Sequence, residues 1–364
     1  MTVGFYSPLP PARTGVADYA AALLAELRKG GSVEIAPARC DLALYHTGNN
    51  RLHAEIYRRA LETPGVAVLH DAVLHHFLLG QLDEAAYIDE FVYNYGEWHR
   101  GLARELWRAR ASSASDPRYF HYPMLKRVAE RSRAVVVHNP AAAEAVRAHA
   151  PNAKIAEIPH LFQAPPSVSE ADVQRYRQKV GVAPGEFLFG IFGYLRESKR
   201  VAQSIDAFLA LRGEMPAMAL LIAGEFASSD LARTVAPMLR EPGVSRLPYL
   251  SENEFWLAAA AVDACINLKY PAAGETSGIA IRLMGLGKPV LMTDSPENTR
   301  YPEDACIRIP ASVAERASLI EHMRLLARMR RTAQEIGRRA AAHIASHHAI
   351  ESVAAQYWEI LRSA

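Results

Sequence analysis

The segment Gly274–Val290, GETSGIAIRLMGLGKPV, combines residue types that suit both a phosphate and a sugar. It follows a strand-like run, Asp263–Leu268, and it opens an amphipathic helix at about Gly278. The free N–H groups and the positive dipole end of a helix start bind phosphate oxygens, and glycine lets a ligand approach the backbone closely. The carboxylate of Glu275 can accept hydrogen bonds from ring hydroxyls. The segment therefore predicts a nucleotide-sugar site, and the plainer alternative is an ordinary strand–turn–helix in which Glu275 favours the helix start.

A second segment upstream, Phe187–Arg200 (FLFGIFGYLRESKR), has the chemistry of a diphosphate loop. An apolar strand ends at Gly193. The turn that follows carries Arg196, Lys199 and Arg200. Basic residues at the carboxyl end of a parallel strand lie where ligands bind open α/β sheets, and Arg grips phosphate as a fork whereas Lys acts as a point charge. Two such turns in one predicted sheet favour a shared ligand over two solvated, charged turns.

Polar residues also follow strand-like runs in the first half of the chain. His70 and Asp71 close the run Val66–Leu69, where a histidine is placed for acid–base or orienting work. The loop YHTGNN at Tyr45–Asn50 suits acceptor hydroxyls, although its glycine and asparagines are also ordinary turn residues. His138 and Asn139, at the end of another run, are open to both readings. So are His75 and His76, for which the alternative is packing in the core.

Short apolar runs alternate with helical patterns along the whole chain, which predicts an α/β fold with parallel sheets covered on both faces. The first half contains the runs Val3–Tyr6, Ser32–Ala36, Asp41–Tyr45, Val66–Leu69, Ala134–Val137 and Lys154–Ile158. The second half contains the runs Phe187–Phe192, Ala217–Ala223, Ala264–Leu268, Pro289–Met292 and Ala305–Ile309.

Length and composition limit the classes of function. A chain of 364 residues is long for a single core, so two domains are expected. A net charge of only +2 gives no global electrostatic case for nucleic-acid binding. The three cysteines, Cys40, Cys265 and Cys306, have no metal-ligand spacing and no disulfide pattern, which favours a reducing cytoplasm. No apolar run approaches the roughly 20 residues that span a bilayer, and the amino terminus begins a strand rather than a signal peptide.

A Pro-rich and polar piece, 160–181, separates the two series of strands and predicts the linker. The tail from residue 316 onwards reads as consecutive helices, the last of them at Ala349–Ser363. Residues 81–131 interrupt the strand–helix rhythm with aromatic and arginine residues. They predict a helical insertion, with a peripheral membrane contact as the alternative to aromatic residues in a core and arginines in solvent.

These motifs and their order resemble the GT-B-fold retaining glycosyltransferases of family 4, also called group 1. Nearly the whole chain fits that organisation. The resemblance rests on GETSG…GKPV, on GYLRESKR, on the first-strand loop YSPLPPARTGVAD at Tyr6–Asp18 and on IPH at Ile158–His160. It implies two Rossmann-like domains with a cleft between them: an acceptor domain at 1–163, a sugar-nucleotide domain at 164–345 and a carboxyl-terminal helix at 346–364 that returns to the first domain.

The resemblance also implies roles for individual residues. His70, Glu275 and Lys199 are the expected catalytic residues, with His70 at the cleft near the transferred sugar. Nucleotide-sugar binding is expected from Gly15, Gly193, Arg196, Lys199, Glu275, Thr276, Ser277, Gly278 and Arg282.

Two departures from the family pattern concern the nucleotide. The family has a second glutamate about two helical turns after the first, which grips the ribose. Counting from either end of the motif, that place falls on Leu283 or Arg282. Arg282 could reach the phosphate instead, or it could be a solvated helix residue. In the basic loop, Tyr194 stands where the family has an arginine, and Arg196 is displaced from that place by two positions.

The resulting expectation is a hexosyl-type transferase that moves a sugar from a nucleoside-diphosphate sugar to a glycan, lipid-linked or other hydroxyl acceptor in glycan or polysaccharide biosynthesis. No confident nucleophile is present, which favours a same-face route, and no Asp-x-Asp pair follows a strand, which favours transfer without a metal and without another cofactor. The expected location is the cytoplasm, including the inner membrane face. The alternatives are a sugar-nucleotide epimerase or hydrolase, and a non-catalytic nucleotide-sugar-binding subunit.

Overall fold

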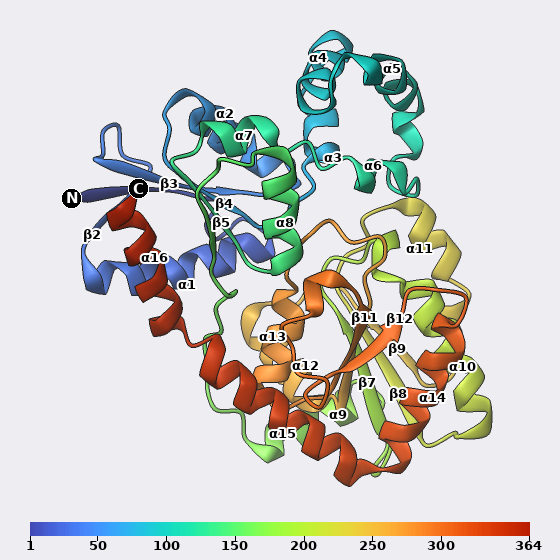
Figure 1. The fold of residues 1–364 in the computed structure, drawn as a ribbon. Helices are drawn as coiled ribbons and strands as arrows, with labels where there is room; N and C mark the ends of the chain where they lie inside the picture. The colour runs from blue at the N-terminus through green and yellow to red at the C-terminus, as the bar shows by residue number, and fades with distance from the viewer. The chain divides into compact units, whose positions relative to one another are not determined.

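The structure is a computed structural model that describes residues 1–364, and it divides into two compact units (Figure 1). The first unit comprises Met1–Leu161, Pro271–Thr276 and His347–Ala364. The second unit comprises Phe162–Tyr270 and Ser277–Ser346. The expectation of two Rossmann-like α/β parts is confirmed, because each unit is built on its own six-stranded parallel sheet.

The sheet of the first unit has the strand order β2-β1-β3-β4-β5-β6, and all its neighbours are parallel. Its strands are β1 (Thr2–Tyr6), β2 (Ser32–Ile35), β3 (Leu42–Thr47), β4 (Val66–Leu69), β5 (Ala134–Val137) and β6 (Ile155–Glu157). The strands β3, β4 and β5 are buried on both faces, which accounts for their nearly continuous apolar sequences. The strand order reverses between β1 and β3, a place where open α/β sheets bind ligands at the carboxyl edge.

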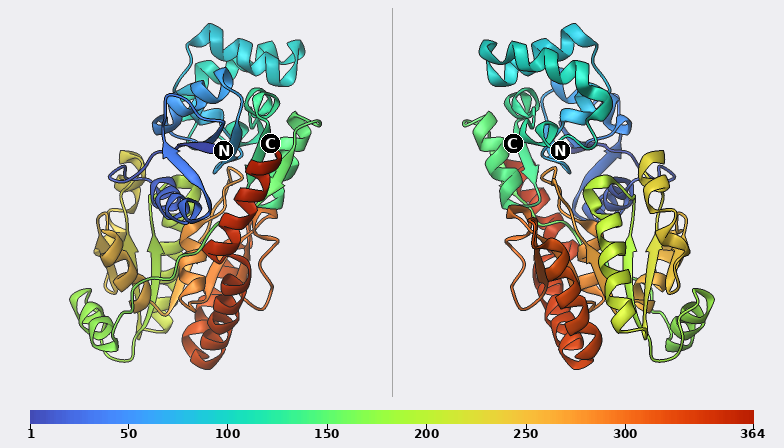
Figure 2. Two further views of the ribbon diagram at one scale, coloured as in Figure 1. Left: turned by 90° about the vertical axis from the view of Figure 1, so that its left-hand side faces the viewer. Right: turned by 90° about the vertical axis from the view of Figure 1, so that its right-hand side faces the viewer.

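The first unit also contains helices beside this sheet and in the insertion at 81–131 (Figure 1). They are α1 (Gly15–Gly30), α2 (Ala54–Glu62), α3 (His75–Leu79), α4 (Glu84–Tyr95), α5 (Arg100–Ala109), α6 (Arg118–His121), α7 (Lys126–Arg131), α8 (Pro140–His149) and α16 (Ile350–Ser363). The carboxyl-terminal helix α16 runs beside α1 (Figures 1 and 2), where the hydroxyls of Tyr19 and Tyr357 lie 2.9 Å apart and Trp358 packs against Gly30 and Gly31. The last helix therefore completes the first unit, as the resemblance implied.

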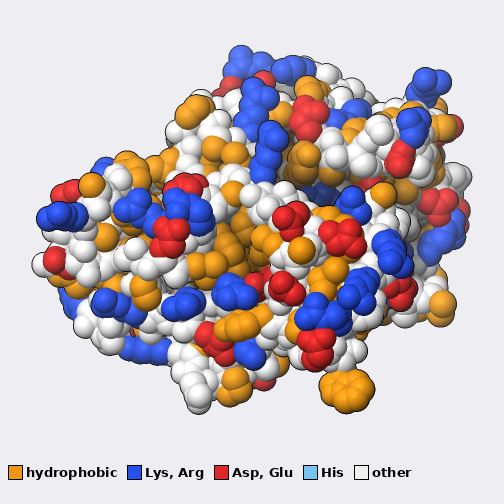
Figure 3. Space-filling model, turned by 90° about the horizontal axis from the view of Figure 1, so that it is seen from above, with side chains coloured by type: hydrophobic (Ala, Val, Ile, Leu, Met, Phe, Trp, Pro, Cys, Tyr) orange, Lys and Arg blue, Asp and Glu red, His pale blue; other side chains and the backbone are white.

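The insertion at 81–131 is helical, and most of its aromatic residues form a core. Tyr87 and Phe91 are buried, and Tyr95 and Trp107 pack against the same cluster. The exceptions are Trp98, which is 99% exposed, and Tyr93, which is 37% exposed. Residues 81–131 contain eight acidic and eight basic side chains. Figure 3 shows acidic and basic side chains interspersed over the face of the molecule seen from above. The core alternative for these aromatics is thus confirmed for all but the exposed ones.

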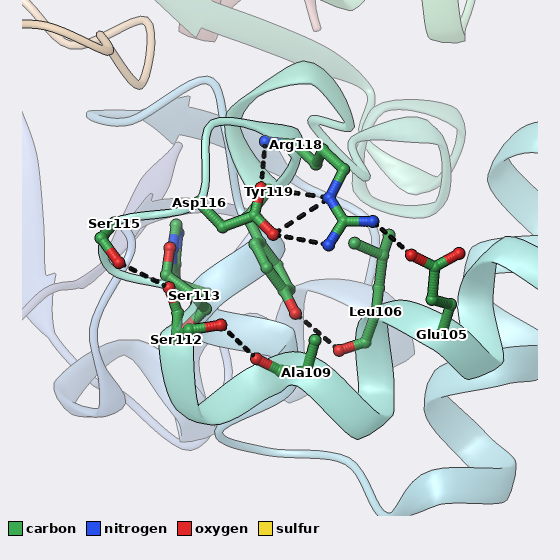
Figure 4. Close-up of polar contacts among 10 residues, drawn as sticks. Glu105, Leu106, Ala109, Ser112, Ser113, Ser115, Asp116, Arg118 and Tyr119 are labelled. Carbon is green, nitrogen blue, oxygen red and sulfur yellow. Dashed lines mark hydrogen bonds and ion pairs between the residues drawn. The ribbon is translucent and has the colours of Figure 1, made fainter.

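Ion pairs hold the far end of this insertion together (Figure 4). The guanidinium of Arg118 lies between the carboxylates of Asp116, at 2.7 Å, and Glu105. The next residue, Tyr119, is buried and donates its hydroxyl to the carbonyl of Leu106 at 2.6 Å. Arg118 therefore binds neighbouring side chains and is not simply a solvated arginine.

The sheet of the second unit has the order β12-β11-β10-β7-β8-β9 and is also fully parallel. Its strands are β7 (Phe187–Phe192), β8 (Met218–Ala223), β9 (Val244–Leu247), β10 (Ala264–Asn267), β11 (Val290–Asp294) and β12 (Ile307–Pro310). The order reverses between β7 and β10, so the carboxyl ends of these two neighbours form the switch point at which Rossmann sheets bind nucleotides.

The helices of the second unit are α9 (Glu170–Lys179), α10 (Val201–Glu214), α11 (Ser229–Val235), α12 (Glu252–Ala261), α13 (Gly278–Gly285), α14 (Glu315–Arg328) and α15 (Arg330–His347). Two separate clusters of buried apolar side chains, one on each face of the sheet, attach these helices to it. None of the helices in the structure has the length and apolar character needed to cross a membrane.

Candidate functional site

The carboxyl end of β7 approaches the end of β8 so closely that side chains are excluded. Gly193 has φ +92° and Gly224 has φ +144°, both in the region that favours glycine. The amide of Gly193 donates to the carbonyl of Ala223 at 2.9 Å. A Cβ at Gly224 would lie 1.8 Å from the carbonyl oxygen of Gly193. Glycine at 193 and 224 thus leaves bare backbone at the edge of the sheet, where a ligand can approach it.

Lys199 points back into this glycine turn. The 3-10 turn Glu197–Lys199 places its ammonium 2.6 Å from the carbonyl oxygen of Phe192, to which it donates. A Cβ at Gly193 would lie 2.9 Å from Lys199 Nζ. The predicted diphosphate lysine therefore lies directly over the glycine that ends β7.

The start of α13 lies at the same place. Ser277 caps this helix by accepting from the amide of Ala280 at 3.3 Å, and it donates its own hydroxyl to Asn267 Oδ1, at the end of β10, at 3.1 Å. The side chain of Ile279 lies 3.5 Å from where a Cβ of Gly193 would be. The basic loop after β7 and the helix start after β10 are thus brought together, and a helix start with a nearby ammonium can hold a phosphate group.

Two arginines of the basic loop have different surroundings. Arg196 is exposed, with its guanidinium 5.4 Å from the ring centre of Tyr194, and it forms no ion pair. Arg200 has left-handed backbone (φ +55°) and binds the buried carboxylate of Glu315 through both Nε, at 3.0 Å, and Nη2, at 2.7 Å. Arg196 is therefore available to a ligand, whereas Arg200 fixes the loop to α14.

Arg282 is occupied by neighbours on α12. Its guanidinium lies 3.1 Å from the carboxylate of Glu252 and 5.0 Å from the ring centres of both Phe255 and Trp256. A contact with phosphate, which the sequence offered as one of two alternatives, would require this arrangement to open. The structure accounts for Arg282 without a ligand.

The loop Pro271–Thr276, which carries Glu275, groups with the first unit by its contacts. Asn139 donates through Nδ2 to the carbonyl of Gly274 at 2.9 Å and to the hydroxyl oxygen of Thr276 at 3.0 Å. Thr276 in turn donates to the carbonyl of His138 at 3.2 Å, and the amide of Ala72 donates to the carbonyl of Ala273 at 2.8 Å. These bonds give the loop a fixed course.

Within that loop, the carboxylate of Glu275 turns back on its own backbone. Its Oε2 accepts from the amide of Ala273 at 2.7 Å. Such a bond orients the carboxylate. Gly278, the first residue of α13, and Ser277 belong to the second unit, so the predicted motif is divided between the two compact units.

Histidines gather at the carboxyl ends of β3, β4 and β5 in the first unit. His46 Nδ1 lies 2.9 Å from His70 Nε2, and the ring centres of His70 and His138 are 5.2 Å apart. Tyr19, from α1, lies with its ring centre 4.9 Å from that of His70 and 4.7 Å from that of His160. His46, His70 and His138 are all buried. The predicted residue His70 therefore belongs to a packed cluster of rings.

Burial decides the charge of this cluster. It lowers the pKa of His138 to about 4, and it lowers the pKa values of His46 and His70 well below their ordinary range. Nearby imidazoles act in the same direction, because each would repel a second positive charge. At neutral pH the rings are uncharged, so they can exchange hydrogen bonds with uncharged ligand groups but offer no net charge to a phosphate.

The remaining predicted residue, Gly15, is the first residue of α1, immediately after the cap formed by Thr14. Nothing lies within 4 Å of the position that a Cβ would take. Space for a ligand is therefore present beside this helix start, one turn before Tyr19.

Sequence reasoning missed several partners in these clusters. Tyr19, which packs in the ring cluster, was not singled out. Asn139, which binds the glutamate loop, was considered only beside His138, and His46 was considered only as part of a polar loop. The available signal was that three histidines, His46, His70 and His138, each lie at or just after the end of a buried strand. The carboxyl ends of parallel strands meet at one edge of the sheet.

A cavity of the second unit lies away from these residues. It has a volume of about 410 Å³ and is lined by residues that precede β7, β10 and β11, among them Glu186, Asp263 and Lys288. It therefore opens at the amino ends of the strands. Nowhere does the structure bring together three or more His, Cys, Asp or Glu side chains that could hold a metal ion.

No family model matches the chain, and no curated protein matches its sequence. Solved structures match its fold. The Anabaena protein HepE in complex with UDP-glucose has a TM-score of 0.67 at 15% identity, with 100% of both chains covered. Sucrose-phosphate synthase from Thermosynechococcus elongatus has a TM-score of 0.70 at 14% identity, covering 100% of this chain and 98% of that one. WaaG, a glycosyltransferase involved in lipopolysaccharide biosynthesis, has a TM-score of 0.68 at 14% identity, with both chains covered in full.

At identities this low, the likeness concerns the fold. It agrees with the two parallel six-stranded sheets described above. The chain has the GT-B fold of two Rossmann-like domains.

Proposed function

We propose that the protein is a glycosyltransferase that moves a sugar from a nucleoside-diphosphate sugar to a hydroxyl acceptor. The observation that carries the proposal is the meeting of Gly193, Lys199 and the start of α13 at the switch point of the second sheet. This place offers bare backbone, an ammonium and free helix N–H groups, which together suit a diphosphate. HepE, which shares the fold, is named as a complex with UDP-glucose and with UDP, and this supports the same donor class here.

In this proposal the second unit stabilises the diphosphate as it leaves. Lys199, the exposed Arg196 and the helix start at Ser277 and Gly278 supply positive charge and N–H donors. Such fixed donors accelerate a reaction in which negative charge develops. Glu275 accepts hydrogen bonds from the sugar, and no metal or other cofactor takes part.

The finer assignment is a retaining hexosyl transfer of the family 4 type, by attack on the face from which the diphosphate departs. Support comes from the sequence resemblance and from the surroundings of the histidines. A double displacement needs a carboxylate nucleophile, whereas the side chains stacked around the His70 ring are the neutral rings of Tyr19, His46 and His138. We place the reaction in glycan or polysaccharide biosynthesis in the cytoplasm.

The acceptor is assigned to the first unit, where neutral rings of the His70 cluster suit hydroxyl groups. If the acceptor is lipid-linked, the contact with a membrane surface is proposed for Trp98 together with Arg104 and Arg108. Trp98 is 99% exposed, and neither arginine forms an ion pair. Flotation with vesicles of mixed anionic and zwitterionic lipid tests this contact, and Trp98→Ala should reduce the bound fraction.

The experiment that tests the function measures release of nucleoside diphosphate from a panel of nucleotide sugars that includes UDP-glucose. The proposal predicts release that depends on an added hydroxyl acceptor. Glu275→Gln should lower kcat about a hundredfold, because it weakens bonds to the sugar in the transition state. The matched control is Glu214→Gln, since Glu214 pairs with Arg324 on the exposed surface of the second unit and should leave kcat unchanged.

The outcomes separate the alternatives. Release or isomerisation without any acceptor would identify a hydrolase or epimerase. Tight binding of a nucleotide sugar with no turnover under any acceptor would identify a non-catalytic binding subunit. Either result would contradict the transferase assignment.

A further inference from the structure

Two histidines of the first unit share a direct hydrogen bond. His46 Nδ1 and His70 Nε2 are 2.9 Å apart, and the rings are stacked with centres 5.2 Å apart and an angle of 21° between their planes. One nitrogen of this pair must donate and the other must accept. The bond therefore couples the position of the proton on His70 to the position of the proton on His46.

Both rings are neutral, so each carries a single N–H. The groups that face the pair are the rings of Phe5, Tyr19 and His138 and the more distant His53 and His160, and none of these is a carboxylate. Burial lowers the pKa of His46 and the pKa of His70 well below the ordinary range. Two arrangements remain, one for each direction of the shared bond.

The surroundings of the second ring nitrogen of His46 distinguish these two arrangements. Its Nε2 is sealed from solvent and has no hydrogen-bond partner. If His70 donated, the proton of His46 would sit on this Nε2 as a buried N–H without an acceptor, which folded proteins rarely contain. If His46 donates through Nδ1, its Nε2 carries only a bare lone pair.

Two neighbouring histidines show that the structure tolerates a bare Nε2. His53 Nδ1 lies 2.9 Å from the carbonyl oxygen of His46, and His138 Nδ1 lies 2.9 Å from that of Ile158. A carbonyl only accepts, so both rings carry their proton on Nδ1. In both rings Nε2 is likewise buried without a partner.

We infer that His46 is a positioning residue that fixes His70 with its proton on Nδ1. The Nε2 of His70 accepts from His46, so the single N–H of His70 is on the opposite side of the ring. His70 Nδ1 makes no hydrogen bond and, unlike His46 Nε2, is not sealed from solvent. His70 thus offers a ligand a neutral N–H donor for an oxygen atom and does not offer a base. The tautomer follows from the geometry alone, and its use in catalysis rests on the proposed function.

The test is a nitrogen NMR measurement on the full chain with 15N-labelled histidine. Couplings between each ring nitrogen and the carbon-bound ring protons show which nitrogen carries the proton, and His70→Asn assigns the signals. The inference predicts protonated Nδ1 and bare Nε2 for His70. A protonated Nε2 on His70 in the wild-type protein would overturn it.

Two substitutions at position 46 separate the hydrogen bond from packing. His46→Asn places an amide N–H near the position of Nδ1 and should keep the His70 tautomer, whereas His46→Phe keeps a ring without a donor and should populate the Nε2-protonated form. An unchanged tautomer in a folded His46→Phe protein would contradict the inference. If that variant does not fold, the spectra of the wild-type protein and of His46→Asn still test which nitrogen of His70 carries the proton.

Activity gives the second readout. His46→Phe should lower kcat about tenfold with little change in KM, and His46→Asn should restore most of it. An equal loss of kcat in both folded variants would contradict a role of His46 through its N–H donor. The NMR result needs neither donor nor acceptor, so a protein that transfers no sugar but carries Nδ1-protonated His70 would refute the transferase proposal and leave this inference standing.

Discussion

The two units differ in charge at equivalent places in their sheets. In the second unit, the carboxyl edge offers bare backbone at Gly193, the ammonium of Lys199 and a helix start. In the first unit, the same edge carries the uncharged, buried rings of His46, His70 and His138. A parallel sheet therefore supplies the position of a site, and the side chains after each strand decide whether that site favours an anion or a neutral, hydroxyl-bearing group.

The largest expected effect concerns the proposed diphosphate site in the second unit. Gly224→Ala would place a methyl group 1.8 Å from the carbonyl oxygen of Gly193 at a backbone φ of +144°. We expect a loss of about 3 to 5 kcal/mol in the free energy of unfolding, together with loss of diphosphate binding. Denaturant unfolding measures the first quantity and calorimetric titration the second.

The matched control is Gly213→Ala. Gly213 lies in α10 with nothing within 4 Å of a Cβ position, so this change should raise stability by about 0.5 to 1 kcal/mol. Equal effects of the two substitutions would contradict the close approach of β7 and β8.

Acid should destabilise the neutral histidine cluster of the first unit. Burial lowers the pKa of His138 to about 4, so the unfolded chain takes up this proton at a higher pH than the folded protein does. Stability is complete above about pH 6.5 and falls as the pH drops from there towards 4, by about 1.4 kcal/mol per pH unit for each such histidine. Melting temperature measured against pH follows the loss.

His138→Asn sharpens this prediction. The amide can still donate to the carbonyl of Ile158, but it does not titrate. The variant should be less sensitive to acid by the contribution of one histidine while remaining folded at pH 7. A stability profile as steep as that of the wild-type protein would show that His138 is not among the groups responsible.

The smallest effect concerns the border of the anion site. Arg282→Gln breaks the pair with Glu252 and the stacking on Phe255 and Trp256, which should cost about 1 kcal/mol of stability. Diphosphate affinity should stay within twofold, because the guanidinium is already occupied. A tenfold loss of diphosphate affinity in a titration would show instead that Arg282 contacts the phosphate.

Much of the fold could be predicted from the sequence, because buried parallel strands are continuous apolar runs. The runs at Val66–Leu69, Ala134–Val137 and Phe187–Phe192 match β4, β5 and β7 residue for residue. The missed strand is β9, with the sequence VSRL at the sheet edge. Its half-buried pattern and central Ser245 and Arg246 leave no apolar run to recognise.

The candidate site, like the fold, could be predicted only in part. Spacing placed Lys199 and Ser277 after two strands of one predicted sheet, and the structure shows that these strands, β7 and β10, are neighbours. Sequence could not show that Glu275 packs with the first unit, or that His46 bonds to His70, because these depend on contacts between residues far apart in the chain. The sequence also could not show whether Arg282 contacts the phosphate, because an ion pair between two helices has no local sequence pattern.

The central claim is that the Lys199 turn binds a nucleoside diphosphate, and calorimetric titration with UDP, GDP, ADP, CDP and dTDP tests it most directly. The account predicts that at least one of these binds and that Lys199→Ala weakens it by about tenfold or more, the loss expected for a charge-assisted hydrogen bond. Lys179→Ala, on the exposed face of α9 in the same unit, should leave the affinity unchanged. Absence of binding by all five, or equal affinities for the wild-type protein and Lys199→Ala, would contradict the account.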